Sequence, residues 1–322
     1  MKNALYVVKV ARKVVEAVDI CSFELVDPDG GSLPPFSAGA HIDVQAPGGL
    51  LRQYSLCNDP QETGRYLIGV LRDAASRGGS VAMHDQVREG DSLHISAPKD
   101  HFSLVHGARR SLLLAGGIGV TPILCMAERL AAINAEFEMH YCTRSRSRTA
   151  FVERIERSTF AASVRFHFDD GDVEQRLDIP SLLSSPDPDT HLYVCGPTGF
   201  LTFVLDAAKN QGWSGARIHY EYFGAPAGPA DADNAGFDVK VASTGRVYRI
   251  EPDKSIVAAL AGYGVEIPVS CEQGVCGTCI TRVIAGVPDH RDVFFTDQEH
   301  AKNDQLTPCC SRAKSPLLIL DL

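Results

Sequence analysis

The chain has 322 residues, 44% of them hydrophobic and 22% charged, which is typical of a globular protein with two or three domains. Its formal net charge of −9 at pH 7 argues against nucleic-acid binding, which needs a basic surface. No apolar run reaches the ~18 residues of a membrane span, and the charged N-terminal segment lacks a signal-peptide cleavage site. With ten cysteines and no secretion signal, we expect a cytoplasmic protein that keeps its thiols for metal.

Residues 1–105 consist of short apolar runs separated by glycine-rich turns. The runs fall at 5–10, 20–26, 66–71 and 92–96. Alternating apolar and polar positions over such lengths indicate half-buried strands, and the breakers between them favour antiparallel pairing. We therefore predict an antiparallel β-barrel domain over 1–105, with a sandwich as the alternative.

The pattern changes over residues 106–224, where apolar strands alternate with helical segments. A strand at 111–115 leads into a glycine-rich turn and a helix to about residue 134, with Thr121 as the expected N-cap and Pro122 as the first helical residue. Further strands are expected at 137–142, 164–168 and 191–195. This alternation predicts an α/β domain with a doubly wound parallel sheet.

A segment without large apolar residues, 225–235, is expected to be a linker between domains. Residues 236–322 then begin with two alternating strands, at 237–242 and 246–250, and a helix at about 255–263. This last block contains both strands and helix and predicts a small α+β domain.

The chemistry of this last block is carried by four cysteines: Cys271, Cys276, Cys279 and Cys309. Their spacing, C-x4-C-x2-C and then 29 residues before the fourth, is the plant-type [2Fe-2S] pattern, in which four thiolates hold two irons. Gly274 and Gly277 allow the loop to wind tightly so that backbone amides point at the cluster. Structural zinc, which prefers two C-x2-C pairs, and buried cysteines that merely pack are the alternatives.

A flavin site is suggested by Arg52, Tyr54 and Ser55, at the end of a barrel strand. Guanidinium binds phosphate with two hydrogen bonds, and an aromatic wall and a small donor suit the flavin ring. The following segment, Gly78, Gly79 and Ser80 after Arg77, opens a helix whose amides favour an anion. Taken separately, these residues are equally compatible with an ordinary strand and a plain loop.

A dinucleotide site is suggested by residues that follow the strands of the α/β block. They are Gly116, Gly117 and Gly119 after the first strand, Thr143 and Arg144 after the second, and Cys195, Gly196 and Pro197 after the last. Ligands of open α/β sheets bind at the carboxyl ends of strands, and a helix N-terminus favours a pyrophosphate. A structural turn, a solvated loop and a core cysteine are the respective alternatives.

Together these segments resemble the phthalate dioxygenase reductase family along essentially the whole chain. The matching segments are RQYSLCND at 52–59, RGGS at 77–80, AGGIGVTPI at 115–123, YCTRS at 141–145, YVCGPTG at 193–199, HYEYFG at 219–224, SCEQGVCGTC at 270–279 and CCSRAKSPLLILDL at 309–322. The resemblance implies an N-terminal FMN barrel, a central NAD domain and a C-terminal plant-type ferredoxin domain of β-grasp fold.

The resemblance also implies roles for further residues. Arg72 would join the phosphate and ribitol contacts of FMN, Thr121 would lie near the flavin edge, and Phe223 would cover the flavin face. Two positions depart from the expected pattern: Arg72 stands where lysine is familiar, and Cys310 follows the fourth cysteine where an apolar residue is familiar. We expect Cys310 not to be a ligand, because adjacent side chains of an extended segment point to opposite faces.

The implied activity is electron transfer from NADH, through FMN and the [2Fe-2S] cluster, to a terminal Rieske-type oxygenase, either a ring dioxygenase or a demethylase. We expect a transient protein partner, no intervening ferredoxin and no catalytic side chain, because the chemistry belongs to the cofactors. Arg144 and Arg146 leave NADPH open as the donor. A flavin or nitric-oxide reductase and a cluster-based redox sensor are the alternatives.

Overall fold

The computed structural model describes residues 5–73, 78–185, 187–224 and 235–322. The chain divides into two compact units, Met1–Phe223 and Gly224–Leu322. Arg77 and nearly all of the expected linker, 225–235, lie outside the described residues. None of the helices in the described ranges has the length and apolar character that a bilayer crossing requires.

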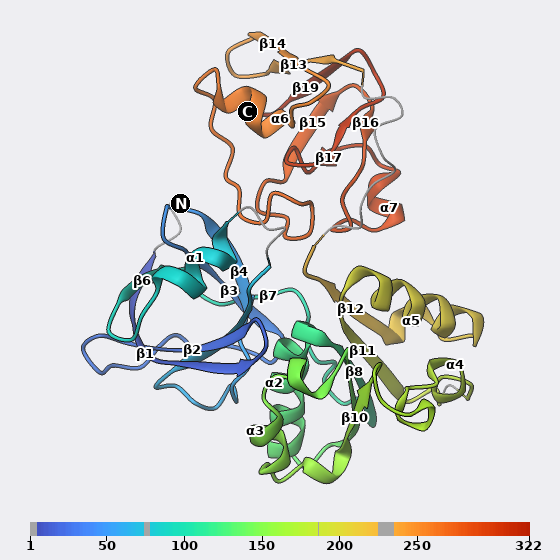
Figure 1. Cartoon of the computed structure of the whole chain (residues 1–322). Coiled ribbons are helices and arrows are strands. Elements are labelled where there is room, and N and C mark those ends of the chain that lie inside the picture. Colours follow the sequence, from blue (N-terminus) through green and yellow to red (C-terminus); the bar gives the residue numbers. More distant parts are fainter. Residues whose placement is uncertain (1–4, 74–77, 186, 225–234) are drawn as a thin grey trace. The chain divides into compact units, whose positions relative to one another are not determined.

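The first unit begins with an antiparallel β-barrel (Figure 1). Its strands are β1 (Tyr6–Ala17), β2 (Ile20–Val26), β3 (Ala40–Gln45), β4 (Leu51–Ser55), β5 (Tyr66–Leu71), β6 (Ser92–Ile95) and β7 (Lys99–Asp100). They follow the order β4-β3-β6-β1-β2-β5, with β7 paired to β3. A bridge between Leu56 and Ile68 links the two ends of this order and closes the barrel. The barrel predicted for the N-terminal block is confirmed.

The second half of the first unit is a parallel sheet with the order β10-β9-β8-β11-β12. Its strands are β8 (Arg110–Gly116), β9 (Glu136–Thr143), β10 (Val164–Phe168), β11 (Thr190–Gly196) and β12 (Ile218–Tyr222). The chain runs outward from β8 to β10, then returns to β11 beside β8, so the carboxyl ends of β8 and β11 form the topological switch point. Only β12 was not predicted, because its residues are half-buried and mostly polar or aromatic.

Both faces of this sheet are covered, as a doubly wound fold requires. Leu113 of β8 belongs to a core shared with α2, whereas its neighbours Leu112 and Leu114 belong to a core with α5. The helices are α2 (Val120–Ala132), α3 (Val152–Glu156), α4 (Ile179–Leu182) and α5 (Thr198–Asn210). The α2 core also contains Ile20 and Phe102 of the barrel block, so the two parts of this unit pack together.

The start of α2 differs from the prediction. A 3-10 turn over Gly117–Gly119 runs directly into the helix, which begins at Val120 with Gly119 at the N-cap position. Thr121 is therefore inside the helix and is not its cap; its hydroxyl donates to the Ile118 carbonyl at 3.1 Å. The prediction was wrong because the glycine-rich turn is itself helical and leaves no extended residue for a side-chain cap.

The second unit is a mixed sheet with a packed helix, in agreement with the β-grasp prediction. The sheet contains β13 (Phe237–Val241), β14 (Val247–Ile250), β15 (Thr281–Ala285), β17 (Gln305–Leu306) and β19 (Leu317–Leu320), in the order β14-β13-β19-β15-β17. Helix α6 (Ile256–Ala261), capped by the Ser255 hydroxyl, contributes to the core beneath this sheet. A small pair, β16 (Pro288–Asp289) and β18 (Arg312–Ala313), and α7 (Asp297–His300) complete the unit.

Candidate functional site

The expected phosphate site of the flavin brings β4 against the start of α1 (Gly79–Gln86), which lies beside β4 and β5. A Cβ placed on Gly79 would lie 2.7 Å from Cγ and 2.8 Å from Nε of Arg52. The guanidinium stem therefore rests directly on the first residue of the helix. This places the Arg52 guanidinium beside the N-terminus of a helix, a combination that suits a terminal phosphate.

Among the described residues, none forms a hydrogen bond with the buried hydroxyl of Tyr54. Burial also raises the pKa of this phenol, and the ring packs against the barrel core. A buried hydroxyl is costly unless it is satisfied, so the group fits a site in which a bound molecule supplies the partner. The residues present thus fit FMN at this position.

Two other expected flavin residues, Ser80 and Arg72, lie at opposite ends of α1. The Ser80 hydroxyl accepts from the Asp73 amide at 3.2 Å, next to the helix start. Arg72 instead forms an ion pair with Asp85 at 3.0 Å, in the last turn of α1. The structure therefore places Arg72 at the opposite end of this helix from Gly79.

Ser55, at the end of β4, faces a half-buried acid, Glu221, that sequence reasoning missed. Its hydroxyl donates to Oε2 of Glu221 at 3.4 Å, and Glu221 on β12 is in register with Cys195 on β11. Burial raises the pKa of Glu221 to about 8 and that of Cys195 well above its usual range. The sequence signal was an acidic residue inside HYEYFG, a segment otherwise noted only for its aromatics.

Thr121 lies where the barrel meets the parallel sheet. A Cβ on Gly69 of β5 would be 2.8 Å from Cγ2 of Thr121 and 3.2 Å from the ring of Phe151. Thr121 itself is buried. Thr121, the expected flavin-edge residue, therefore lies between the barrel and the parallel sheet, where its methyl group packs against the backbone of Gly69.

The switch point between β8 and β11 is closely packed. A Cβ on Gly196 would lie 3.0 Å from Cα of Gly116, and one on Gly119 would lie 2.3 Å from the Cys195 carbonyl oxygen. Gly117, in contrast, has φ of +54° and open space around it. Gly119 and Gly196 are therefore required for packing, whereas Gly117 leaves the backbone accessible at the place where nucleotides bind in such sheets.

Some of the residues expected near the adenosine end of the nucleotide are already bonded within the protein, whereas others are exposed to solvent. The Thr143 hydroxyl is used internally, at 2.7 Å from the Thr149 hydroxyl. Arg146 is paired with Glu156 at 3.2 Å. Arg144 is exposed, directly after β9. At the other end of the region, Pro197 precedes α5 and Phe223 is 40% exposed.

The four expected cluster ligands are all buried: three lie in the loop at 271–279, and Cys309 lies in the turn at 308–310. Hydrogen-bonding contacts from Cys276 and Cys309 lower the pKa of Cys271, and similar contacts from Cys309 lower that of Cys279. The Gln273 amide donates to Sγ of Cys271 at 3.3 Å. Four converging sulfurs with amides directed at them fit a [2Fe-2S] cluster.

Two glycines shape this loop as expected. Gly274 and Gly277 have φ of +72° and +69°, which glycine adopts without strain. A Cβ on Gly274 would lie 2.4 Å from Sγ of Cys310, and one on Gly277 would lie 2.4 Å from the ring of Phe294. Neither position has room for a side chain.

Cys310 is not where the alternation argument places it. Residues 308–310 form a turn and are not extended, so adjacent side chains do not simply alternate. The Cys310 sulfur lies against Gly274 and 3.2 Å from the Thr307 hydroxyl, and it also contacts Cys309. The reason given for excluding it was wrong, and the choice of Cys309 as fourth ligand stays a prediction.

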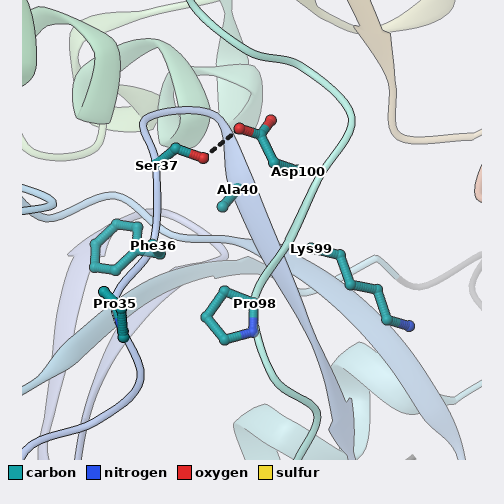
Figure 2. A pocket seen from close by; sticks show the side chains of 7 residues that line it. All are labelled: Pro35, Phe36, Ser37, Ala40, Pro98, Lys99 and Asp100. Carbon is teal, nitrogen blue, oxygen red and sulfur yellow. Dashed lines mark hydrogen bonds between the residues drawn. The ribbon is translucent and has the colours of Figure 1, made fainter.

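A separate hollow of about 260 Å³ opens on the barrel, between the segment before β3 and the segment around β7. It is lined by Pro35, Phe36, Ser37, Ala40, Pro98, Lys99 and Asp100 (Figure 2). The Ser37 hydroxyl donates to the Asp100 carboxylate at its edge. It contains none of the residues predicted for flavin, nucleotide or cluster.

Comparison with known proteins extends these observations. Residues 239–314 match the family described as 2Fe-2S iron-sulfur cluster binding domain. The chain is 57% identical over 306 residues to the vanillate O-demethylase oxidoreductase of Pseudomonas sp. (strain HR199 / DSM 7063), covering 95% of this chain and 96% of the relative. It is 41% identical over 315 residues to the phthalate dioxygenase reductase of Burkholderia cepacia, covering 98% and 96%. A solved structure of phthalate dioxygenase reductase aligns with a TM-score of 0.79 and 40% identity, over 100% of this chain and 99% of that one.

The fold and the cysteine site define an iron–sulfur flavoprotein of the electron-transfer oxidoreductase class. The chain belongs to the phthalate dioxygenase reductase family, whose members are the reductase components of oxygenase systems. The match over residues 239–314 gives the chain a [2Fe-2S] cluster, and the solved phthalate dioxygenase reductase is described as transferring electrons from pyridine nucleotides to [2Fe-2S]. Electrons pass from a pyridine nucleotide through a flavin and the cluster to an oxygenase.

Proposed function

We propose that this chain is the reductase of a Rieske-type O-demethylase that acts on vanillate or a similar methoxylated aromatic acid. Identity to the vanillate O-demethylase oxidoreductase is clearly higher than identity to the phthalate dioxygenase reductase. The reductase does not touch the aromatic substrate, so this similarity bears on which oxygenase it serves and only through that oxygenase on the substrate. The observation that supports the reductase role is that one chain contains candidate sites for a flavin, a nucleotide and an iron–sulfur cluster.

Within the first unit, we assign the flavin to the surface formed by β4 and the start of α1. Arg52 and the first-turn amides at Gly78 and Gly79 would hold the phosphate, and Tyr54 would supply the aromatic wall and a hydroxyl. When bound, FMN accepts two electrons as a hydride and releases them one at a time, which the cluster alone cannot do. The protein's task is therefore to position groups, without a general acid or base.

The nicotinamide is assigned to the switch point between β8 and β11. Gly116, Gly117 and Gly119 would let the dinucleotide approach the backbone, and Cys195 and Gly196 would border the ring. Ser55 and Glu221 lie on the barrel side of the same region, since Glu221 is the register partner of Cys195. The Ser55–Glu221 contact joins β4, the proposed flavin strand, to β12, the neighbour of β11 at the proposed nucleotide site, and so supports placing the two cofactors near each other.

Electrons would leave through the cluster held by four ligands: Cys271, Cys276, Cys279 and Cys309. We propose that the oxygenase docks directly on the second unit, without a separate ferredoxin, because the conversion of a two-electron donor into single electrons is complete within this chain. The complex must dissociate after each transfer, and weak redox encounters bury less than about 1,200 Å².

Reconstitution tests this function. The purified chain, NADH and its genomically paired oxygenase should demethylate vanillate, with NADH consumed in proportion to the demethylated product. Phthalate in place of vanillate should give no comparable NADH consumption. A requirement for an added small ferredoxin would overturn direct transfer, and turnover of phthalate but not vanillate would overturn the demethylase assignment. Fast NADH-dependent cytochrome c reduction by the chain alone separates a reductase from a redox sensor.

A further inference from the structure

Three side chains of the second unit that have no part in the cluster converge on one point. His300 Nε2 lies 3.1 Å from Oδ2 of Asp292, and His290 Nδ1 lies 3.9 Å from Oδ1 of the same carboxylate. The three ligand atoms are all within 4.8 Å of one another. The imidazole rings are stacked, with centroids 4.4 Å apart.

The carboxylate at the centre of this group is fully buried. It accepts from the Phe295 amide at 2.9 Å and from the Ser311 hydroxyl at 3.4 Å. Across the described residues, its ion-pair contacts are with the two histidines, and neither lysine nor arginine reaches it. A buried carboxylate needs a compensating charge, because removing it from water is expensive.

His290 provides a second, independent observation. Its side chain is 10% exposed, and its Nδ1 atom is buried without a hydrogen-bond partner. The other ring nitrogen, Nε2, lies 3.3 Å from Oδ1 of Asn303. A hydrogen bond to that oxygen places the proton on Nε2 and leaves the Nδ1 lone pair facing Asp292. This is how metal-binding histidines are usually held, with one nitrogen oriented by an outer acceptor.

We propose that His290, Asp292 and His300 form a binding site for one divalent transition metal ion of the zinc class, distinct from the four-cysteine cluster. Two imidazoles and one carboxylate are ligands that such ions prefer, with the remaining positions taken by water. Ligands of one ion at about 2.0–2.1 Å lie no more than about 4.2 Å apart. The two histidine–carboxylate separations, 3.1 Å and 3.9 Å, are within this limit, and a small side-chain adjustment would bring all three atoms, now within 4.8 Å of one another, around one ion.

The ion would connect the end of β16, the loop that contains Asp292 and the end of α7. His290 directly follows β16, and His300 ends α7. Asp292 also adjoins the cysteine loop: a Cβ on Gly274 would lie 2.9 Å from its Cβ, and the Val293 amide donates to the Gly274 carbonyl at 3.2 Å. Metal binding here would therefore stabilise the segment that supports the cluster loop.

Zinc titration of the intact holoprotein tests the proposal. After removal of loosely bound metal, calorimetry with zinc chloride should show one saturable site per chain. His300→Gln and His290→Gln should each weaken zinc binding by roughly 100-fold or more, because loss of a direct ligand exceeds the 10–100-fold cost of losing an outer partner. His191→Gln is the matched control: His191 lies in the first unit and forms a 2.9 Å pair with His219, and among the described residues no third ligand joins this pair. It should bind zinc as the unaltered chain does.

The cluster absorbance of each variant shows whether the second unit is folded. Absence of a stoichiometric zinc site in the unaltered protein would overturn the proposal without any variant. So would zinc affinity that is unchanged in both His290→Gln and His300→Gln, which would leave the three residues as a hydrogen-bonded support only. If His290→Gln loses the cluster, the more exposed His300 on α7 decides the question.

Discussion

The hydroxyl of Ser55 lies 3.4 Å from a carboxylate oxygen of Glu221, and this contact joins β4 of the barrel to β12 of the parallel sheet. The two residues are 166 positions apart in the chain. The register of β12 with β11 places Cys195 beside the same acid. Residues predicted separately for flavin and nucleotide are thereby connected through a residue that was not predicted.

Glu221 should make the stability of the first unit depend on pH. Its pKa of about 8 is above the ordinary 4.5 because burial penalises the charged form. As pH rises from about 4.5 to 8, the unfolded chain ionises this group and the folded one does not, so folding stability is lost across that window. In flavin-free protein, Glu221→Gln should therefore show a smaller decrease in Tm between pH 5 and pH 8.5 than the unaltered chain. Equal decreases in both proteins would contradict the raised pKa of this acid.

Replacement of Gly79 by alanine should weaken FMN binding. The added methyl group would lie 2.7 Å from the Arg52 stem and displace the guanidinium from the helix start. We expect FMN affinity to fall by at least tenfold, measured by quenching of flavin fluorescence on binding. Gly64→Ala is the control, because a Cβ there meets nothing within 4 Å. Retention of normal affinity by Gly79→Ala would argue against a phosphate at this position.

Replacement of Cys276 by serine should remove the cluster absorbance and leave reduction of the flavin by NADH intact. The cluster ligands all belong to the second unit, whereas the flavin and nucleotide residues belong to the first. Anaerobic stopped-flow spectra of the variant separate the two signals. Simultaneous loss of flavin reduction would mean that the units do not fold independently.

Cys310→Ala should keep a normal cluster spectrum and iron content. Although Cys310 contacts Gly274 and Cys309, the resemblance and the spacing assign the fourth ligand to Cys309. Cys309→Ala is the companion variant and should lose iron. The reverse result, with iron retained by Cys309→Ala and lost by Cys310→Ala, would reassign the ligand.

Preference for NADH over NADPH should persist when Arg146 is replaced by glutamine. That guanidinium is occupied by Glu156 at 3.2 Å, so it is poorly placed to receive a 2′-phosphate. Arg144→Gln, at the exposed position after β9, should lower the residual kcat/KM for NADPH more than that for NADH. The ratio of kcat/KM for the two nucleotides checks both variants. A ratio that moves with Arg146 and not Arg144 would reverse these roles.

Local patterns in the sequence were sufficient for much of this protein. The strand at 66–71 and the one at 164–168 were predicted with the observed bounds, because their alternation and their flanking turns are local signals. The cluster ligands could be predicted from sequence because three of the four cysteines lie in one short loop, where their spacing indicates the chemistry. Gly274 and Gly277 lie in the same short loop, and the tight winding predicted for them agrees with their positive φ angles.

Tertiary structure decided the features that depend on distant segments meeting. Contact between Arg52 and Gly79, the acid at Glu221 and the ion pair that occupies Arg72 follow from packing of strands and helices, which no local pattern encodes. The turn at Cys310 shows the same limit on a small scale, since an extended segment was assumed where backbone hydrogen bonds curve the chain. Each side chain's role depends on its neighbours, and for distant neighbours only folding brings the partner within hydrogen-bonding distance.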